Sequence, residues 1–230
     1  MPRTATTTRS EPDPGRHPAR RAAATPLERA LAGPPNGKKA TPLDALAAAR
    51  RMVFADGRID MGALAKELGI GRATLYNWVG SKERLLAEVF WTVASAGIDD
   101  AVVRAKGSGA QFLGEVIERY LTGISSHRPS REFIARDPEY ALRVLASRHT
   151  PFQRRLIERV AELIEDQIAG GGYEPPLDPE SLAFVLVRIG ESFIYADVIT
   201  GSEPDIAMGV EAQRALLHAP PVTRRRSREA

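Results

Sequence analysis

Apolar positions between residues 41 and 218 recur with the period of an α-helix. One apolar stripe runs over residues 112–124 and another over residues 152–168, while no segment alternates as a strand would. Capping residues followed by proline mark four helix starts, and glycines mark most of the ends. The pattern predicts an all-α fold, with helices near residues 42–55, 61–68, 72–78, 82–105, 109–126, 130–136, 138–147, 151–170, 179–200 and 204–218.

The two ends of the chain differ from this helical part. Residues 1–40 are rich in Pro, Thr, Arg and Ala, and only Thr25-Pro26-Leu27-Glu28 reads as the start of a short helix. The net charge is +5 over residues 1–40, +3 over residues 219–230 and −6 over residues 91–218, within an overall +3. We expect disordered basic ends, and a polyanionic partner for only part of the molecule.

Several function classes are excluded or disfavoured by what the sequence lacks. Without cysteine there is no disulfide framework, iron–sulfur cluster or thiol nucleophile, and a cytoplasmic location is expected. The longest apolar run, residues 182–187, is far too short to span a membrane. The histidines lack metal-ligand spacing, and no catalytic constellation is visible. We therefore predict no enzyme activity, no metal and no cofactor.

Residues 60–78 have the spacing of a helix-turn-helix. Asp60 is placed to cap the first helix, and Ala65 supplies the small residue needed where two helices cross steeply. Gly69 suits the left-handed conformation at the helix end, Ile70 faces the core, and Gly71 starts the second helix.

The outward positions of the second helix carry side chains suited to reading DNA. Arg and Asn pair with guanine and adenine, Ala and the Thr methyl contact thymine, and Tyr and Trp bind the sugar–phosphate backbone. Ser81 then caps the next helix, where free N–H groups beside Lys82 form a phosphate clamp. The alternative is a purely structural hairpin within an ordinary helical bundle. The predicted DNA-contacting residues are Arg72, Ala73, Thr74, Tyr76, Asn77, Trp78 and Lys82.

Residues 64–85 resemble the signature of TetR-family one-component regulators, most specifically over residues 73–85. The resemblance implies a homodimer, a palindromic double-stranded DNA operator and a small-molecule sensor in the C-terminal helices. It also implies phosphate contacts from Thr74, Tyr76 and Lys82, and base contacts from Arg72, Ala73 and Asn77.

The chain departs from the family pattern at three places. Asp60 and Gly71 replace hydroxyl residues, and Trp78-Val79 replaces His or Tyr followed by Phe. An acid at position 60 would repel phosphate, so no phosphate contact is expected there. Residues 78–81 together with residues 133–139 resemble the QsdR-type branch of the family.

The helix predicted over residues 179–200 is apolar nearly all round, so it should be buried on several sides. In a dimer it can face its own domain and the partner, with the stripe of residues 151–170 as its companion. The residues expected at this dimer interface are Leu156, Val160, Leu163, Leu186, Ile189 and Phe193.

Arg188, Glu191 and Tyr195 fall on one face of the same apolar helix. They can orient a ligand in an apolar pocket, or Arg188 and Glu191 can form a structural ion pair. Four aromatic residues are further candidates for lining a pocket, although such residues equally belong to a core: Trp91, Phe112, Tyr120 and Phe133.

The sequence thus predicts a basic arm (1–40), a DNA-binding domain (41–88), a regulatory and dimerisation domain (89–218) and a basic tail (219–230). The predicted function is a ligand-responsive repressor, a homodimer released from its operator by a small apolar or amphipathic inducer, with no membrane partner. The alternatives are a helical enzyme or protein-interaction module with a structural hairpin, and a DNA-binding dimer without a ligand.

Overall fold

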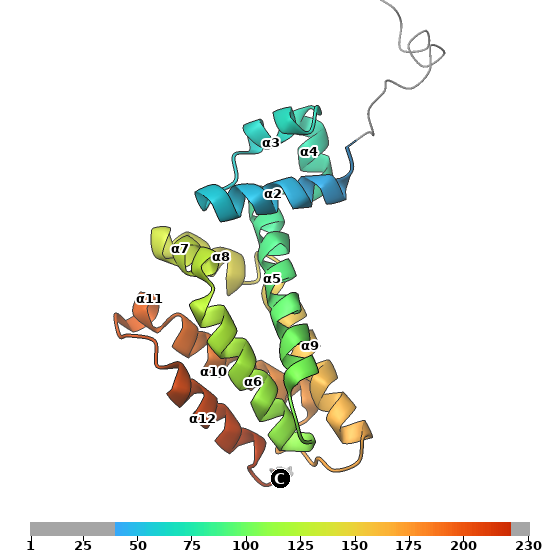
Figure 1. Ribbon diagram of the computed structural model, residues 1–230, viewed down its shortest axis with the longest axis vertical. Coiled ribbons are helices and arrows are strands. Elements are labelled where there is room, and N and C mark those ends of the chain that lie inside the picture. Colours follow the sequence, from blue (N-terminus) through green and yellow to red (C-terminus); the bar gives the residue numbers. More distant parts are fainter. Residues whose placement is uncertain (1–39, 222–230) are drawn as a thin grey trace, which may run out of the picture. The chain divides into compact units, whose positions relative to one another are not determined.

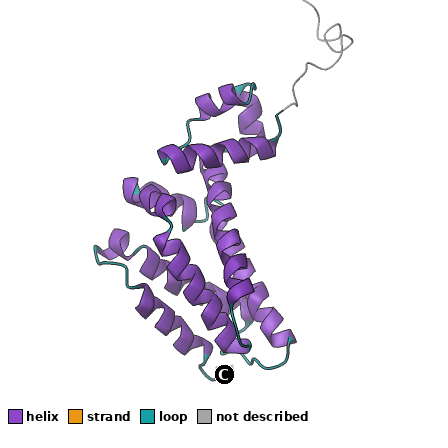
Figure 2. Ribbon diagram, viewed as in Figure 1, coloured by secondary structure: helices purple, strands orange, loops and turns teal. Residues whose placement is uncertain are grey.

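The computed structural model describes residues 40–221, and within them every regular element is a helix (Figure 2). Nearly all of the predicted arm with its short helix, and most of the predicted tail, lie outside these residues. The helices are α2 (Pro42–Asp56), α3 (Met61–Glu67), α4 (Arg72–Val79), α5 (Lys82–Arg104), α6 (Gly109–Ser126), α7 (Arg128–Arg136), α8 (Pro138–Leu145), α9 (Phe152–Ala169), α10 (Pro179–Ile194), α11 (Ala196–Thr200) and α12 (Ile206–Leu217).

Most helix starts follow the caps that the sequence predicts. At α2 the Thr41 hydroxyl accepts from the Asp44 N–H while the Asp44 carboxylate binds the Thr41 N–H, and Gly57 ends the helix with a φ of 66°. The all-α prediction is confirmed. One expected helix is divided, because the predicted segment 179–200 breaks at Tyr195 into α10 and α11.

Helix α5 connects the two ends of the described region. It packs against α2 and α4, and also against α6, α8 and α9. Figure 1 shows it running from α2 down between α6 and α9. The predicted boundary between residues 88 and 89 falls inside this continuous helix. The division into a DNA-binding and a regulatory domain remains a prediction.

The buried side chains form one apolar cluster that extends from α2 to α12. Leu64 and Leu75 belong to it in α3 and α4, and Leu182 belongs to it in α10. Because the cluster is continuous, the short helices α3 and α4 are held by burial against the longer ones rather than by their own helix propensity. Within residues 40–221 no helix is both long and apolar enough to cross a membrane.

Candidate nucleic-acid interface and internal cavity

The turn between α3 and α4 has the geometry that the sequence predicts. Gly69 has a φ of 66°, in the left-handed region, and its N–H bonds the carbonyl of Lys66. The Ile70 N–H reaches back to the carbonyl of Ala65 at 3.0 Å. Ala65 and Leu75 are both buried, so the two helices meet through a small residue and a leucine. These contacts fix the direction of α4 relative to α3.

The first turn of α3 carries an exposed negative charge. Asp60 accepts hydrogen bonds from the N–H groups of Gly62 and Ala63, at 2.7 and 3.0 Å. These backbone donors lower the pKa of Asp60, and Arg72 and Arg58 lower it further. Asp60 is therefore ionised at neutral pH, and its charge occupies the position where a phosphate would otherwise bind the helix start.

The exposed face of α4 holds most of the predicted DNA-contacting side chains. Tyr76 is 42% exposed, although it is a large aromatic residue. The guanidinium of Arg72 lies against Gly62, so closely that a Cβ at position 62 would collide with it. Arg72 is thus folded over the start of α3 in this structure. The exposed members of the face are Arg72, Ala73, Thr74, Tyr76 and Asn77.

Trp78 differs from the expectation of an outward ring. It is half-buried and packs against the apolar core. The reason is helical geometry, because residue 78 lies three positions after the buried Leu75 and on the same side of the helix. Its indole therefore belongs at the edge of the exposed face rather than on it.

The start of α5 lies directly after α4 in the chain. The Ser81 hydroxyl accepts from the Arg84 N–H at 3.2 Å, which confirms Ser81 as the N-cap. The half-buried Lys82 is the first residue of the helix. Glu83 accepts a hydrogen bond from the Tyr140 hydroxyl at 3.3 Å, and its own backbone N–H, Ser81, Tyr140 and Lys82 lower its pKa. The carboxylate of Glu83 is thereby held by Tyr140 of α8.

Helix α7 and its N-cap contact α2 at two points that the sequence did not predict. The Arg136 guanidinium donates to the carbonyl of Asp56 at 2.5 Å, at the end of α2. The rings of His127 and Phe54 meet edge-on with centroids 5.8 Å apart. These partners are more than seventy residues apart in the chain, and neither has a local signal in the sequence.

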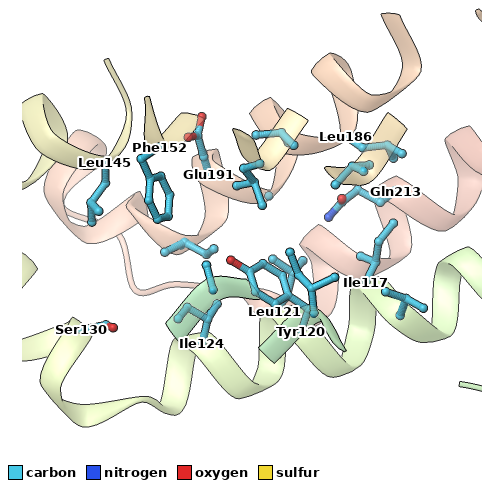
Figure 3. Close-up of a pocket in the computed structure, with 18 of the residues that line it drawn as sticks. Ile117, Tyr120, Leu121, Ile124, Ser130, Leu145, Phe152, Leu186, Glu191 and Gln213 are labelled. Carbon is cyan, nitrogen blue, oxygen red and sulfur yellow. The ribbon is translucent and has the colours of Figure 1, made fainter. Parts of the chain in front are cut away.

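An internal cavity of about 100 Å³ lies among α5, α6, α7, α8, α9, α10 and α12 (Figure 3). Its walls are mainly aliphatic and aromatic, as at Leu121, Phe152 and Leu186. Figure 3 shows the Tyr120 side chain extending across it, with Glu191 on a facing helix. A cavity with apolar walls and a few polar groups is the usual form of a small-molecule site.

The structure brings some of the predicted ligand residues together and separates others. The cavity is lined by Tyr120, Glu191 and Tyr195. Arg188 forms an ion pair with Glu191. Trp91, Phe112 and Phe133 do not line it. Trp91 packs against Phe152 and under the guanidinium of Arg155, Phe133 stacks on Phe90 at 4.5 Å, and Phe112 packs against the core cluster.

Comparison with known proteins shows which proteins share this architecture. Residues 108–218 match the family described as tetracyclin repressor-like, C-terminal domain. The structure is similar to QsdR from R. erythropolis, a TetR-family transcriptional repressor, with a TM-score of 0.72 and 27% identity over 80% of this chain and 97% of that one. The chain therefore has a TetR-like fold with a tetracyclin repressor-like C-terminal domain.

A second TetR-family repressor shares the fold. AlkX from Dietzia sp., implicated in biodegradation of n-alkanes, gives a TM-score of 0.53 at 21% identity, over 79% of this chain and 97% of that one. The search of curated proteins found no match. The described residues of this chain contain no cluster of His, Asp and Glu that could hold a metal ion.

Arg188 and Glu191 form the ion pair of the structural interpretation, and the ligand-orienting role stays a prediction. Arg188 lies 2.8 Å from a Glu191 carboxylate oxygen, and the Gln153 amide lies 3.2 and 3.4 Å from the two oxygens. Burial nevertheless raises the pKa of Glu191 to about 7, against the opposing effects of Arg188 and Gln153. The pair is a structural contact within α10, and its acid also lines the cavity.

The structure corrects three of the predicted dimer-interface residues. Leu156, Leu163 and Leu186 are buried within their own chain and line the cavity. Val160, which also lines the cavity, is only half-buried, as are Ile189 and Phe193, so the place of these three at a dimer interface stays a prediction. Phe193 packs beneath Gly209 of α12. The sequence pattern identified the apolar helices correctly but could not distinguish the stripe that faces inward from the one left outside.

The exposed apolar side chains on these two helices are different ones. Ile168 of α9 is 37% exposed and Phe184 of α10 is 52% exposed. Since α9 and α10 pack directly against each other, both residues lie on one pair of packed helices.

Proposed function

We propose that this chain is a homodimeric DNA-binding repressor of the TetR family, which a small apolar or amphipathic molecule releases from a palindromic operator. The single observation that carries the proposal is the exposed face of α4 next to the first turn of α5, on a chain whose residues 91–218 have a net charge of −6. One end of the molecule is thus suited to DNA, and the rest repels it.

In the proposed complex α4 lies in the major groove. Arg72, Ala73 and Asn77 face bases, while Thr74 and Tyr76 contact phosphates. Arg72 would have to leave Gly62 to reach a base, which a flexible exposed side chain can do. Lys82 and the free N–H groups of the first turn of α5 would then hold a phosphate, because a helix start carries a partial positive charge.

The proposed dimer uses α9 and α10 from each chain as a four-helix interface about a two-fold axis. Ile168 and Phe184 support this arrangement, because large apolar side chains gain about 1.5–3 kcal/mol each when fully buried. A dimer places two α4 helices in successive major grooves, about 34–36 Å apart.

The proposed inducer occupies the internal cavity. Its effect on DNA would travel through α5, because Phe90, Ala94 and Ile98 line the cavity and Lys82 begins the same helix. Helix α7 offers a second route, since Arg131 lines the cavity and Arg136 holds the end of α2. The inducer must bind the released state more tightly, because only such a difference can shift the equilibrium.

DNA binding at Lys82 is tested with the full chain. Duplexes that bind it are first selected from a random-sequence pool, and affinities are then measured by fluorescence anisotropy at several salt concentrations. Lys82→Ala should weaken binding to every duplex and reduce the slope of log K against log salt by about one, because one phosphate contact is lost.

The matched control is Lys106→Ala, which removes an exposed lysine beyond the other end of α5. It should leave the salt slope unchanged. A Lys82→Ala slope equal to that of the unmodified chain would remove the proposed phosphate contact, and failure to select any duplex would refute DNA binding.

A further inference from the structure

Three polar residues of the cavity form what we call the tyrosine–glutamate cluster: Tyr120 and Tyr195 with their hydroxyls and Glu191 with its carboxyl group. Glu191 and Tyr195 lie one helical turn apart at the end of α10 and line the same surface cleft, and Figure 3 shows Tyr120 extending across the cavity with Glu191 on a facing helix. Burial raises the pKa of both tyrosines, and the charge of Glu191 raises it further. Ser130, Arg131 and Gln213 line other parts of the wall.

The two tyrosine hydroxyls have unused hydrogen-bonding capacity. Neither hydroxyl bonds any group in the described part of the chain, and neither is sealed off, because no buried side-chain oxygen among the described residues lacks a partner. Two half-buried tyrosines show the contrast, since Tyr173 donates to the carbonyl of Leu217 and Tyr140 donates to Glu83. The hydroxyls of Tyr120 and Tyr195 are therefore open to a molecule in the cavity that their residues line.

The charges around the cluster are already balanced. Arg188 lies 2.8 Å from Glu191, and Arg131, which also lines the cavity, lies 3.7 Å from Asp197. A carboxylate placed here would meet the acid of Glu191, and an ammonium group would meet the guanidinium of Arg188. Either ion would also lose its water shell, which is far more costly than for a neutral group.

We propose that the cavity binds an uncharged amphiphile whose head group is a hydroxyl or a primary amide. The head group accepts hydrogen bonds from Tyr120 and Tyr195 and donates one to Glu191. The hydrocarbon part lies among apolar side chains such as Leu121, Ile124 and Leu186. This assignment rests on the proposed role of the cavity as the inducer site and names the chemical class of the inducer.

The size and surroundings of the cavity limit the ligand further. An engineered apolar cavity of about 150 Å³ holds benzene, so a cavity of about 100 Å³ suits a smaller hydrocarbon, of about four carbons. Glu191 and Tyr195 also line a surface cleft with Arg143 and His149. The cluster therefore lies where cavity and cleft meet, which places the head group at the cleft and the hydrocarbon inside.

Three four-carbon probes that differ only in the head group test the class of ligand: butan-1-ol, butanoate and butylamine. Binding to the full chain is measured by isothermal titration calorimetry at pH 8. Butan-1-ol should bind at least tenfold more tightly than either ion. Butanoate or butylamine binding as tightly as the alcohol would overturn the assignment, and so would a failure of all three to bind.

Four variants test the cluster itself. Tyr120→Phe and Tyr195→Phe should each weaken butan-1-ol binding about fivefold to tenfold, because each removes one donor. The control Tyr173→Phe should change nothing, since that hydroxyl bonds Leu217 away from the cavity. Glu191→Gln should increase butanoate affinity at least fivefold. Unchanged butan-1-ol affinity in both cavity variants would show that the tyrosines do not hold the head group.

The experiment separates this inference from the proposed function. Operator binding without DNA release by butan-1-ol, and without calorimetric binding, leaves a DNA-binding protein and refutes the ligand class. Calorimetric binding of butan-1-ol with no selectable DNA supports the ligand class and refutes the repressor.

Discussion

Glu191→Gln should remove a pH dependence of folding stability that the buried acid creates. The Glu191 side chain is only 8% exposed, and burial raises its pKa from 4.5 to about 7. Between these values the folded chain holds a proton that the unfolded chain releases. The stability of the unmodified chain should therefore fall as the pH rises from 4.5 to 7, with no further loss from this group above pH 7.

The size of the effect follows from the pKa difference. Each pKa unit corresponds to about 1.4 kcal/mol, so the full difference is about 3 kcal/mol. Glutamine has the same shape and carries no ionisable proton. The free energy of unfolding of Glu191→Gln minus that of the unmodified chain should therefore rise by about 3 kcal/mol between pH 4.5 and pH 7.5.

The assay is urea denaturation of both proteins, followed by far-UV circular dichroism, at half-unit steps across this pH range. Subtracting the two profiles cancels every other titrating group that the substitution leaves alone. The control is Glu158→Gln, which replaces an exposed carboxylate paired with Arg154 on α9. Parallel profiles for Glu191→Gln and the unmodified chain would refute the claim that Glu191 is buried at a raised pKa.

Four further substitutions test other contacts. Leu75→Ala should lower the free energy of unfolding by about 3 kcal/mol in urea, since Leu75 is fully buried. Gly69→Ala should lower it by about 1 kcal/mol because φ is 66°, and equal thermal midpoints would contradict this. Phe184→Glu should shift dimer to monomer in analytical ultracentrifugation. Arg136→Ala should reduce the inducer's effect on operator affinity in anisotropy titrations, while calorimetric affinity for the inducer stays within twofold.

The helices were predictable from sequence because their signals are local. Thr41, Asp60 and Ser81 cap the helices they were expected to cap, and Gly69 adopts the expected conformation. Those signals involve residues within four positions of each other. The break of the long C-terminal helix at Tyr195 has no such signal, since neither proline nor glycine stands there.

The candidate sites were predictable only where the positions next to a residue in the sequence determine which side of its helix it lies on. Tyr76 is exposed because it follows the buried Leu75 by one position, and one step along a helix turns the side chain by about a quarter turn. Periodicity placed Leu156 and Leu186 on the apolar faces of their helices, but it did not show which neighbouring helix each face would contact. Their burial against the cavity depends on contacts between α9 and α10, which no local pattern encodes.

The placement of α5 has a consequence for how such a protein evolves. The buried Ala94 lines the cavity, and the helix that carries it begins at the proposed phosphate contact. Under the proposed function, a larger side chain at this position would fill the cavity permanently and imitate a bound inducer. Mutations that adapt the cavity to a new compound would then also alter DNA affinity. A lineage that changes its inducer would have to adjust its operator contacts at the same time, so the two specificities would be inherited together.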